Sequence, residues 1–268
     1  MIADASRPLA RGTFPPRWVQ SRDLLRELIA RDIALRYRGS LLGILWTLLN
    51  PLAELLVLLL VFGKVLPVNI PNFSAFLFTG LIVYGWFQIS VNLATLAIVG
   101  NRELVKRPGV PLLILPVVTV ASNLVHFVLS LPILLGLLFM SDISLTRAVF
   151  ALPVLIAIEF VLILGFAYPL ATINVWFRDT THVLRVALQL LFYLTPVFYA
   201  AESAPAGFRW FYRFNPLAQM VDAYRAVLLR GTLPSASSLV YLTVLSSALM
   251  VIGILWFHRA SSRFADEL

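Results

Sequence analysis

The sequence predicts an all-α polytopic membrane protein with six transmembrane helices, an N-terminal amphipathic interface helix and a re-entrant periplasmic helix pair before the last span. Hydrophobic residues make up 60% of the 268 residues, charged residues only 13%, and the mean hydropathy is +0.90. The apolar residues form runs that reach the roughly 20 residues a helix needs to cross a bilayer. Lys and Arg are concentrated in alternate connecting segments, as expected for a chain that crosses a membrane repeatedly.

The predicted spans are 41–63, 73–99, 112–139, 148–175, 183–200 and 236–257. A polar, basic stretch of about 40 residues precedes the first run, which is too long for the apolar part of a cleavable signal peptide. That run is therefore expected to remain as a span. With the N-terminus inside, 15 of the 21 Lys and Arg fall in predicted cytoplasmic segments and 6 in external ones, which predicts that both termini are cytoplasmic.

The predicted organisation has three parts: a cytoplasmic N-terminal segment (1–38), a transmembrane domain (39–258) and a cytoplasmic C-terminal tail (259–268). The formal net charge of +8 favours anionic lipid head groups as a partner. Nucleic acid is not an expected partner, because no cluster of basic and aromatic residues lies on a soluble domain.

The interface helix is predicted at 21–36, where Leu25, Ile29 and Ile33 repeat every four residues among charged neighbours. Such a helix is too polar to span a bilayer and is typical of one that lies along the cytoplasmic surface of the membrane. A soluble helix that docks on a partner subunit has the same pattern.

Two spans carry polar residues at helical spacing. These are Trp46, Asn50 and Glu54 in the first span, and Arg185, Gln189 and Tyr193 in the fifth, which ends near Pro196. Polar groups inside a bilayer usually face protein or a water-filled cavity, because exposure to lipid costs free energy. The pattern predicts either the wall of a conduit or a packing face between helices.

Two connecting segments have predicted structure of their own. Residues 100–111 read as a basic helix of about two turns that stops at Pro108-Gly109, or else as an ordinary basic cytoplasmic loop. Residues 202–234 are moderately apolar and aromatic, which predicts two short helices broken at Asn215-Pro216 that dip into the outer leaflet. An external loop on the membrane surface is the alternative.

Catalytic and metal chemistry find little support. The sequence has no Cys and three His, and no phosphate-binding loop of the type G-x-x-x-x-G-K-[ST]. His126, alone in an apolar span, is interpreted as an interhelical hydrogen-bonding group rather than a metal ligand. The chain is therefore predicted to be a transport protein with no ATPase of its own, and with no metal or cofactor in this chain.

Several ordered motifs resemble one family. They are Arg36-Tyr37-Arg38-Gly39-Ser40-Leu41-Leu42-Gly43 with Trp46 and Pro51, then Asn101, Leu104, Lys106, Pro111 and Pro116, then Phe177-Arg178-Asp179 with Thr195-Pro196, and finally Asn215-Pro216 with Tyr224-Arg225. From about residue 22 to the C-terminus the chain resembles the membrane subunits of ABC polysaccharide exporters, which carry lipid-linked O-antigen, capsule and teichoic acid. The motifs are specific for the family and not for the cargo.

The resemblance implies a homodimeric permease in the bacterial cytoplasmic (inner) membrane, paired with two copies of a separate ATPase that binds ATP and Mg²⁺. It implies a coupling helix at 101–107, a gate helix at about 177–183 and a re-entrant periplasmic gate at 203–230. The coupling residues would be Asn101, Arg102, Glu103, Leu104, Lys106 and Arg107, and the gate residues Trp210, Phe211, Asn215 and Pro216.

The resemblance also implies that the first and fifth spans of both subunits line a channel. Aromatic rings, amides and phenols suit sugars, which makes Trp46, Asn50, Glu54, Gln189, Phe192, Tyr193 and Tyr199 the candidate lining residues. Arg178 and Arg185 would meet the diphosphate of the lipid carrier at the inner mouth, or else serve only to set topology.

Two other function classes remain open from the sequence. A membrane-embedded transferase acting on lipid-linked sugars would transfer sugar without an ATPase partner. An ABC exporter of drugs or small lipids would share the architecture and have a less polar conduit.

Overall fold

The computed structural model describes residues 17–39, 42–107, 109–201, 205, 207 and 209–268, and within these ranges the secondary structure is helical, with no strand. The α-helices are α1 (Arg17–Tyr37), α2 (Trp46–Leu60), α3 (Phe73–Thr95), α4 (Arg102–Val105), α5 (Ile114–Met140), α6 (Leu152–Trp176), α7 (Thr180–Leu194), α8 (Arg209–Phe214), α9 (Pro216–Leu228), α10 (Ala236–Ser261) and α11 (Phe264–Glu267). A π-helical turn at Val61–Val65 extends α2, and a 3-10 turn at Arg147–Ala151 precedes α6.

Within the described ranges, five helices are long and apolar enough to cross a membrane: Trp46–Val65, Phe73–Thr95, Ile114–Met140, Arg147–Trp176 and Ala236–Ser261. They lie where five of the predicted spans were placed. The predicted span 183–200 is shorter as a helix, since α7 has only 15 residues and ends at Leu194. Thr195 leaves the helical region (φ −96°, ψ 136°) because the proline that follows disfavours a helical backbone at the preceding residue.

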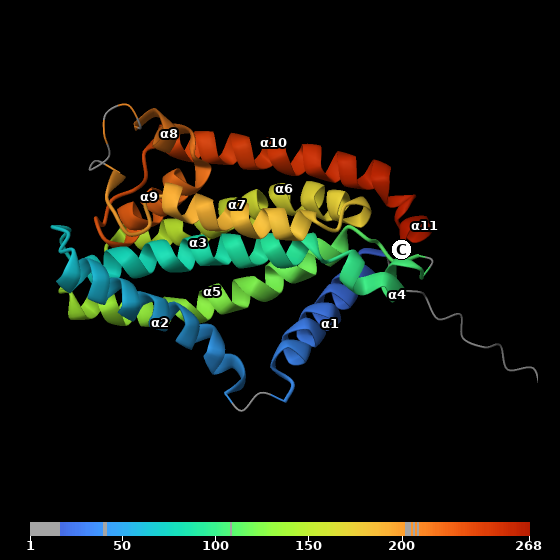
Figure 1. Cartoon of the computed structure of the whole chain (residues 1–268), viewed down its shortest axis with the longest axis horizontal. Coiled ribbons are helices and arrows are strands. Elements are labelled where there is room, and N and C mark those ends of the chain that lie inside the picture. Colours follow the sequence, from blue (N-terminus) through green and yellow to red (C-terminus); the bar gives the residue numbers. More distant parts are fainter. Residues whose placement is uncertain (1–16, 40–41, 108, 202–204, 206, 208) are drawn as a thin grey trace, which may run out of the picture.

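The long helices run side by side along one axis of the molecule (Figure 1). α4, α11 and the C-terminus lie at one end, and α8 and α9 lie at the opposite end. α6 and α10 pack closely along their length. A Cβ on Gly165 would approach Leu249 Cβ to 2.8 Å, and one on Gly253 would approach Pro169 Cδ to 3.0 Å, so glycine is what permits this backbone contact.

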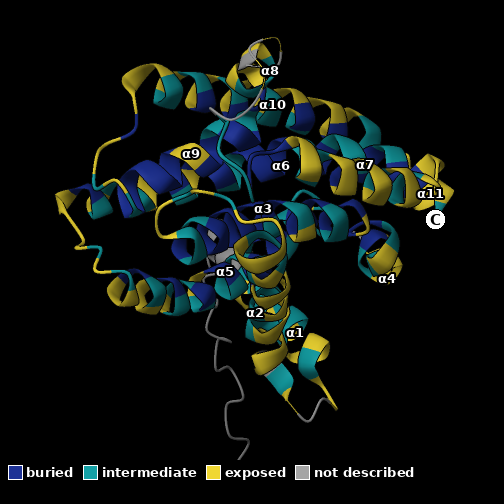
Figure 2. Cartoon of the chain, turned by 60° about the vertical axis from the view of Figure 1, so that its left-hand side comes forward, coloured by how far each residue is buried: buried dark blue, intermediate teal, exposed yellow. Residues whose placement is uncertain are grey.

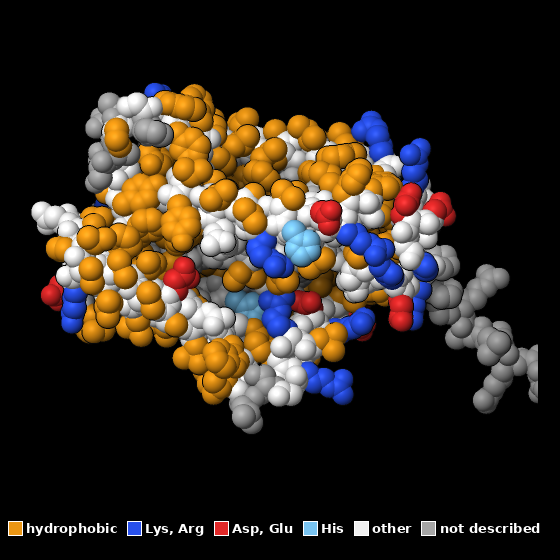
Figure 3. Space-filling model, in the orientation of Figure 1, with side chains coloured by type: hydrophobic (Ala, Val, Ile, Leu, Met, Phe, Trp, Pro, Cys, Tyr) orange, Lys and Arg blue, Asp and Glu red, His pale blue; other side chains and the backbone are white. Residues whose placement is uncertain are grey.

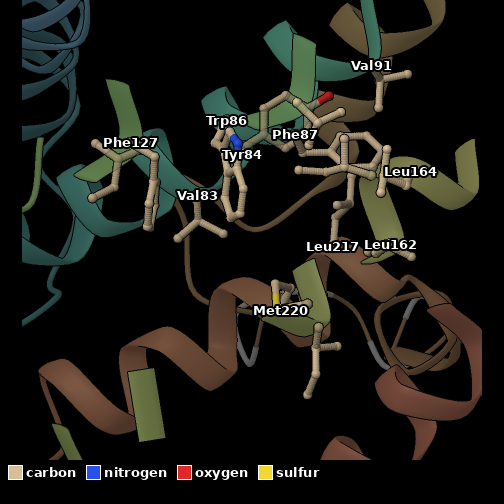
Figure 4. Packing of buried hydrophobic residues seen from close by; sticks show 14 of the residues in the cluster. Val83, Tyr84, Trp86, Phe87, Val91, Phe127, Leu162, Leu164, Leu217 and Met220 are labelled. Carbon is tan, nitrogen blue, oxygen red and sulfur yellow. The ribbon is translucent and has the colours of Figure 1, made fainter. Parts of the chain in front are cut away.

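α3 lies at the centre of the bundle and is the most buried of the spanning helices, whereas α2 is largely exposed (Figure 2). The core around α3 is aromatic (Figure 4). The ring of Trp86 stacks on Phe127 of α5 with centroids 4.9 Å apart, and Phe87 meets Phe166 of α6 edge to face at 5.6 Å. These contacts hold α3, α5 and α6 in one unit.

α1 and α2 form an arm that diverges from the bundle (Figure 1). Along α1, Leu25, Ile29 and Ile33 are half-buried and α1 packs against α5, while Arg26 and Arg31 are exposed. The helical spacing predicted for this segment is therefore present in the structure, and the helix begins at Arg17, earlier than the predicted residue 21. Its position on the membrane surface stays a prediction.

The segment before α10 contains the predicted helix break. α8 ends at Phe214 and α9 begins at Pro216. The Asn215 side chain accepts hydrogen bonds from the backbone N–H groups of Leu217 and Ala218, and Pro216 needs no partner in the first turn, so this dipeptide starts a new helix. Residues 203, 204, 206 and 208 of the predicted gate lie outside the described residues.

Candidate conduit and its two ends

The polar residues of α2 line a cavity. It has a volume of about 510 Å³ and lies between α1, α2, α3 and α5. Trp46, Asn50 and Glu54 all line it, as their spacing on one helical face requires. The opposite wall comes from α3, including Trp86 and Gln88. The structure therefore brings these three predicted residues together.

Beside this cavity, hydrogen bonds join α1 to α5. The Arg36 guanidinium donates to Asn123 Oδ1 at 2.6 Å and to Asp32 Oδ2 at 3.2 Å, and lies 3.3 Å from His126 Nε2. Tyr37 Oη lies 3.0 Å from His126 Nδ1. The interpretation of His126 as an interhelical hydrogen-bonding group is thus confirmed.

The Tyr37 phenol is partly removed from water by this contact. Burial raises the pKa of Tyr37 above its ordinary value, so the hydroxyl keeps its proton at neutral pH. A protonated phenol can donate to an imidazole nitrogen, which makes the contact with His126 a hydrogen bond between neutral or near-neutral partners. Sequence spacing gave no sign of this pairing, because the two residues are 89 positions apart.

The polar face of α7 points elsewhere. Arg185, Gln189 and Tyr193 are exposed, while Leu188 on the other side of the helix is buried against α3. The Tyr84 hydroxyl of α3 donates a hydrogen bond to the Leu188 carbonyl, which fixes the rotation of α7. Within one chain, Gln189 and Tyr193 do not reach the cavity beside α2.

Aromatic residues join the C-terminal end of α7 to the segment beyond it. Phe192 lies against Phe198 at 5.8 Å and beside Tyr193 at 5.5 Å, measured between ring centroids. The Tyr199 hydroxyl donates to the Tyr193 carbonyl at 3.1 Å and lies 3.2 Å from the Tyr212 hydroxyl. Three predicted lining residues, Phe192, Tyr193 and Tyr199, are therefore in one aromatic cluster.

The predicted gate residues continue this cluster. Phe211 packs against Tyr212 at 5.8 Å and against Trp210 at 6.2 Å. Trp210 is exposed, whereas Asn215 is buried and its Nδ2 donates to Thr195 Oγ1 at 3.4 Å. α8 and the start of α9 are thus attached to the end of α7.

Arg225 is the most heavily bonded charged side chain near this end. It is 4% exposed, and its guanidinium donates to the carbonyls of Phe76 (3.1 Å), Pro196 (2.7 Å) and Val197 (2.6 Å). It also lies 3.4 Å from the centroid of the Phe76 ring. One side chain of α9 therefore ties together the start of α3 and the bend after α7. Nothing in the sequence indicates this role, because Arg225 is there only one basic residue of a predicted external segment and part of the Tyr224-Arg225 motif.

The predicted coupling helix is shorter than expected. α4 has one turn, preceded by a 3-10 turn at Val99–Asn101, so the prediction of about two turns is wrong. Asn101 has a non-helical backbone (φ −120°, ψ 41°), so the α-helix starts only at Arg102. Val105 is buried and fixes the turn to the bundle. The exposed side chains are Arg102, Glu103, Lys106 and Arg107, and Asn101 and Leu104 are half-buried.

The predicted gate helix at 177–183 is not a separate helix. α6 ends at Trp176, Phe177 is extended (φ −120°, ψ 91°), and α7 begins at Thr180. Residues 180–183 are instead the first turn of α7. Arg178 lies in the turn and Arg185 lies on α7, and both are exposed. The turn between α6 and α7 lies at the same end of the molecule as α4 (Figure 1).

Comparison with known proteins gives a consistent result. Residues 23–229 match the family of the ABC-2 type transporter. The chain is 37% identical over 251 residues to the O-antigen export system permease protein RfbA of Myxococcus xanthus, covering 93% of this chain and 96% of that protein. It is 31% identical to RfbA of Klebsiella pneumoniae (92% and 95% covered) and 25% identical to the polysialic acid transport protein KpsM of Escherichia coli (86% and 90%). The chain therefore belongs to the membrane family of ABC-2 type transporters.

Proposed function

We propose that this chain is the permease subunit of an ATP-driven exporter that moves a lipid-linked polysaccharide of the O-antigen type across the bacterial cytoplasmic membrane. The observation that carries the proposal is its 37% identity, over almost the full length of both chains, to a permease of O-antigen export. Five long apolar helices and two polar helical faces fit a transport role.

The proposed channel forms between two copies of the chain, with both termini in the cytoplasm. α2 and α7 both face the viewer in Figure 1, and the exposed side of α7 carries Arg185, Gln189 and Tyr193. A polar stripe that faced lipid would cost free energy, and a second copy over this side would remove that exposure. Two copies of a separate subunit would bind ATP and Mg²⁺ and drive transport.

The sixth crossing in this proposal is α7 together with residues 195–200. A helix of 15 residues rises about 22 Å, which is less than the roughly 30 Å of the hydrocarbon core. Thr195, Pro196 and Val197 continue with irregular backbone, and all three are buried. Irregular backbone is tolerated at membrane depth when protein surrounds it.

Deleting the gene and identifying the glycan that remains in the cytoplasm tests the function. Full-length lipid-linked glycan is expected to accumulate inside, and a plasmid copy of the gene should restore export. If the chain were a transferase, the glycan would be unfinished rather than retained. If it exported drugs or small lipids, surface glycan would be unchanged.

The exposed charges of α4 are proposed to receive force from the ATPase. The double substitution Glu103→Gln and Lys106→Gln should leave assembly with the ATPase largely intact and lower export per ATP hydrolysed by about tenfold, because charge-assisted contacts are lost while buried Val105 keeps α4 in place. Glycan export and ATPase activity in proteoliposomes would be measured together. A double variant with wild-type coupling would remove this assignment.

Arg178 and Arg185 are proposed to attract the diphosphate of the lipid carrier. Changing both to Gln should lower the stimulation of ATPase activity by lipid-linked glycan. Raising salt should have the same effect on the wild type, because exposed charges are screened over roughly 8–10 Å at physiological ionic strength. Arg263→Gln, at the same end of the molecule, is the control for general loss of positive charge. Equal stimulation of the double variant and the wild type would leave these residues with a topological role.

A further inference from the structure

The end of the molecule that holds α4 also holds α11, the short helix that follows α10. α11 contacts both α4 and α6, and the two short helices lie together at this end of the bundle (Figure 1). In Figure 3, charged side chains of both signs gather at the same end, whereas the opposite part of the visible face is mostly hydrophobic. Elements 160 residues apart in the sequence are thus brought onto one small, charged surface.

A buried aromatic side chain fixes α11 in this position. Phe264 has no exposed surface, and its ring meets Trp176 of α6 at 5.8 Å and Phe257 of α10 at 5.2 Å, both edge to face and measured between ring centroids. Leu268 is half-buried against the same core. Edge-to-face contacts are a favoured arrangement of aromatic rings, so α11 is a packed part of the bundle.

The end of α10 indicates where α11 lies relative to the membrane. Trp256 is exposed to the outside of the bundle, and the exposed His258 and Arg259 follow it in the last turn of α10. A tryptophan followed by basic residues at the end of a spanning helix is typical of the interface between membrane and water. α11 begins only at Phe264, after α10 has ended at Ser261, and it therefore lies on the water side of that interface.

The exposed charged side chains of the two short helices differ in sign. They are Arg102, Glu103, Lys106 and Arg107 at α4, which is basic on balance, and Asp266 and Glu267 on α11. Within the part of the chain that the structure describes, none of the six forms an ion pair. Charges that do not pair within the chain are free to pair across an interface. We call α4 and α11 together the α4–α11 surface.

A soluble protein fits the α4–α11 surface better than a lipid surface does. With both termini in the cytoplasm, as proposed above, the nearest lipid head groups are anionic, and they attract Lys and Arg but repel carboxylates. Asp266 and Glu267 therefore need a basic partner that the membrane does not supply. A stable protein interface covers about 800 Å² on each partner, which is more than one helical turn offers, so a protein that contacts α4 also reaches α11.

We propose that α11 and α4 form one docking surface for the ATPase subunit, and that the facing surface of that subunit is acidic opposite α4 and basic opposite α11. The proposal rests on the proposed function, which already gives α4 a role in coupling, and it adds α11 as a second contact. Phe264 is a positioning residue in this proposal, because it holds Asp266 and Glu267 beside α4 without touching the partner.

Photo-cross-linking in membranes of the native host tests the contact directly. The photo-reactive residue p-benzoylphenylalanine replaces Lys106, Glu267 or Asp142 in turn in the full-length chain, and mass spectrometry identifies the cross-linked protein. Positions 106 and 267 should both cross-link to the ATPase. Asp142 is the control, since it is exposed beyond the far end of α5, whose 27 residues rise about 40 Å from the end near α4. Position 142 should give no ATPase cross-link.

Matched variants then test the charges of α11. The double substitution Asp266→Asn and Glu267→Gln should weaken binding of the purified ATPase to the chain in nanodiscs by about tenfold, because charge-assisted contacts are lost. Asp142→Asn makes the same chemical change away from the surface and should bind as the wild type does. Phe264→Ala keeps both carboxylates but releases α11, and it should weaken ATPase binding to a similar extent. Melting temperatures in detergent show which variants keep the fold.

Two results would overturn the proposal and leave the proposed function in place. One is an ATPase cross-link from position 106 without any from position 267. The other is wild-type ATPase affinity of the folded Asp266→Asn, Glu267→Gln double variant. By contrast, if no ATPase cross-links to position 106 or 267 and none co-purifies with the wild-type chain, the proposed function itself fails. If Phe264→Ala does not fold, the double variant still decides the question.

Discussion

Replacing Arg225 by alanine is expected to unfold the end of the molecule that holds α8 and α9, and to abolish export. The substitution leaves the carbonyls of Pro196 and Val197, at the bend after α7, without the donors that the guanidinium supplies. Each buried group that loses a hydrogen bond to a charged partner costs about 1–3 kcal/mol, so the loss of free energy of unfolding should reach about 3–5 kcal/mol. Arg225→Lys should rescue little, because one ammonium cannot reach three carbonyls in the geometry of the planar guanidinium.

Arg230 provides the control for this prediction, because it lies five residues later and is half-exposed in an ion pair with Asp222 at 2.9 Å. A pair of this kind contributes about 0–1 kcal/mol, so Arg230→Ala should leave the melting temperature in detergent nearly unchanged. Gly80→Ala should reproduce part of the Arg225 defect, since its Cβ would lie 2.8 Å from Arg225 Nη2. Gly85→Ala on the same helix meets nothing within 4 Å. Similar melting temperatures for Arg225→Ala and Arg230→Ala would contradict the proposed role.

Single cysteine substitutions along α7 should separate a conduit face from a lipid face. The sequence has no Cys, so each introduced thiol reacts without background. Gln189→Cys and Tyr193→Cys are expected to react with small hydrophilic thiol reagents at least about tenfold faster than Leu190→Cys, because a thiol must ionise to react and hydrocarbon suppresses the thiolate. Labelling in intact membranes, quantified by mass spectrometry, measures the rates.

Leu190 is a matched control because its side chain is about as exposed in the single chain as that of Tyr193. Its side chain is 58% exposed and that of Tyr193 is 56% exposed, and Leu190 is apolar and lies about 100° around α7 from Gln189. On α2, Asn50→Cys and Glu54→Cys should react quickly, and Leu56→Cys, which is 66% exposed and apolar in its surroundings, should not. Equal labelling rates for Gln189→Cys, Tyr193→Cys and Leu190→Cys would mean that no conduit follows the polar face of α7.

The sequence predicted the spanning helices well because each long apolar run has only one stable form in a bilayer, in which every backbone group is bonded within the helix. One predicted span is an exception. Residues 183–200 are continuously apolar enough to read as a span, but the helix ends at Leu194 because of Pro196. The predicted break at Asn215-Pro216 was found, since an asparagine cap followed by proline is a strictly local signal. The predicted lengths at 101–107 and 177–183 were wrong, because the backbone angles at Asn101 delay the start of α4 to Arg102, and those at Phe177 end α6 before α7 begins at Thr180.

The sequence predicted which residues share one face of a helix, but it did not predict which helix packs against that face. Helical spacing placed Trp46, Asn50 and Glu54 on one side of a helix, and the structure puts that side against α3 and α5. Spacing carries no information on which helix lies opposite, which is why the link from Tyr37 to His126 and the three carbonyls around Arg225 were not foreseen. For the contacts of Arg225, the available signal in the sequence was a charged side chain next to Tyr224 within the apolar stretch 216–228.

The amino-acid sequence by itself determined the place of the five long helices, the break before α9 and the polar faces of two helices, because local apolar length, proline and helical period decide these. The tertiary structure alone decided that the polar side of α2 encloses a cavity with α1, α3 and α5, and that the polar side of α7 stays exposed. The physical reason is that hydrogen bonds such as Arg36 to Asn123 and Arg225 to the Phe76 carbonyl join residues 87 and 149 positions apart. Their geometry exists only once the helices have packed.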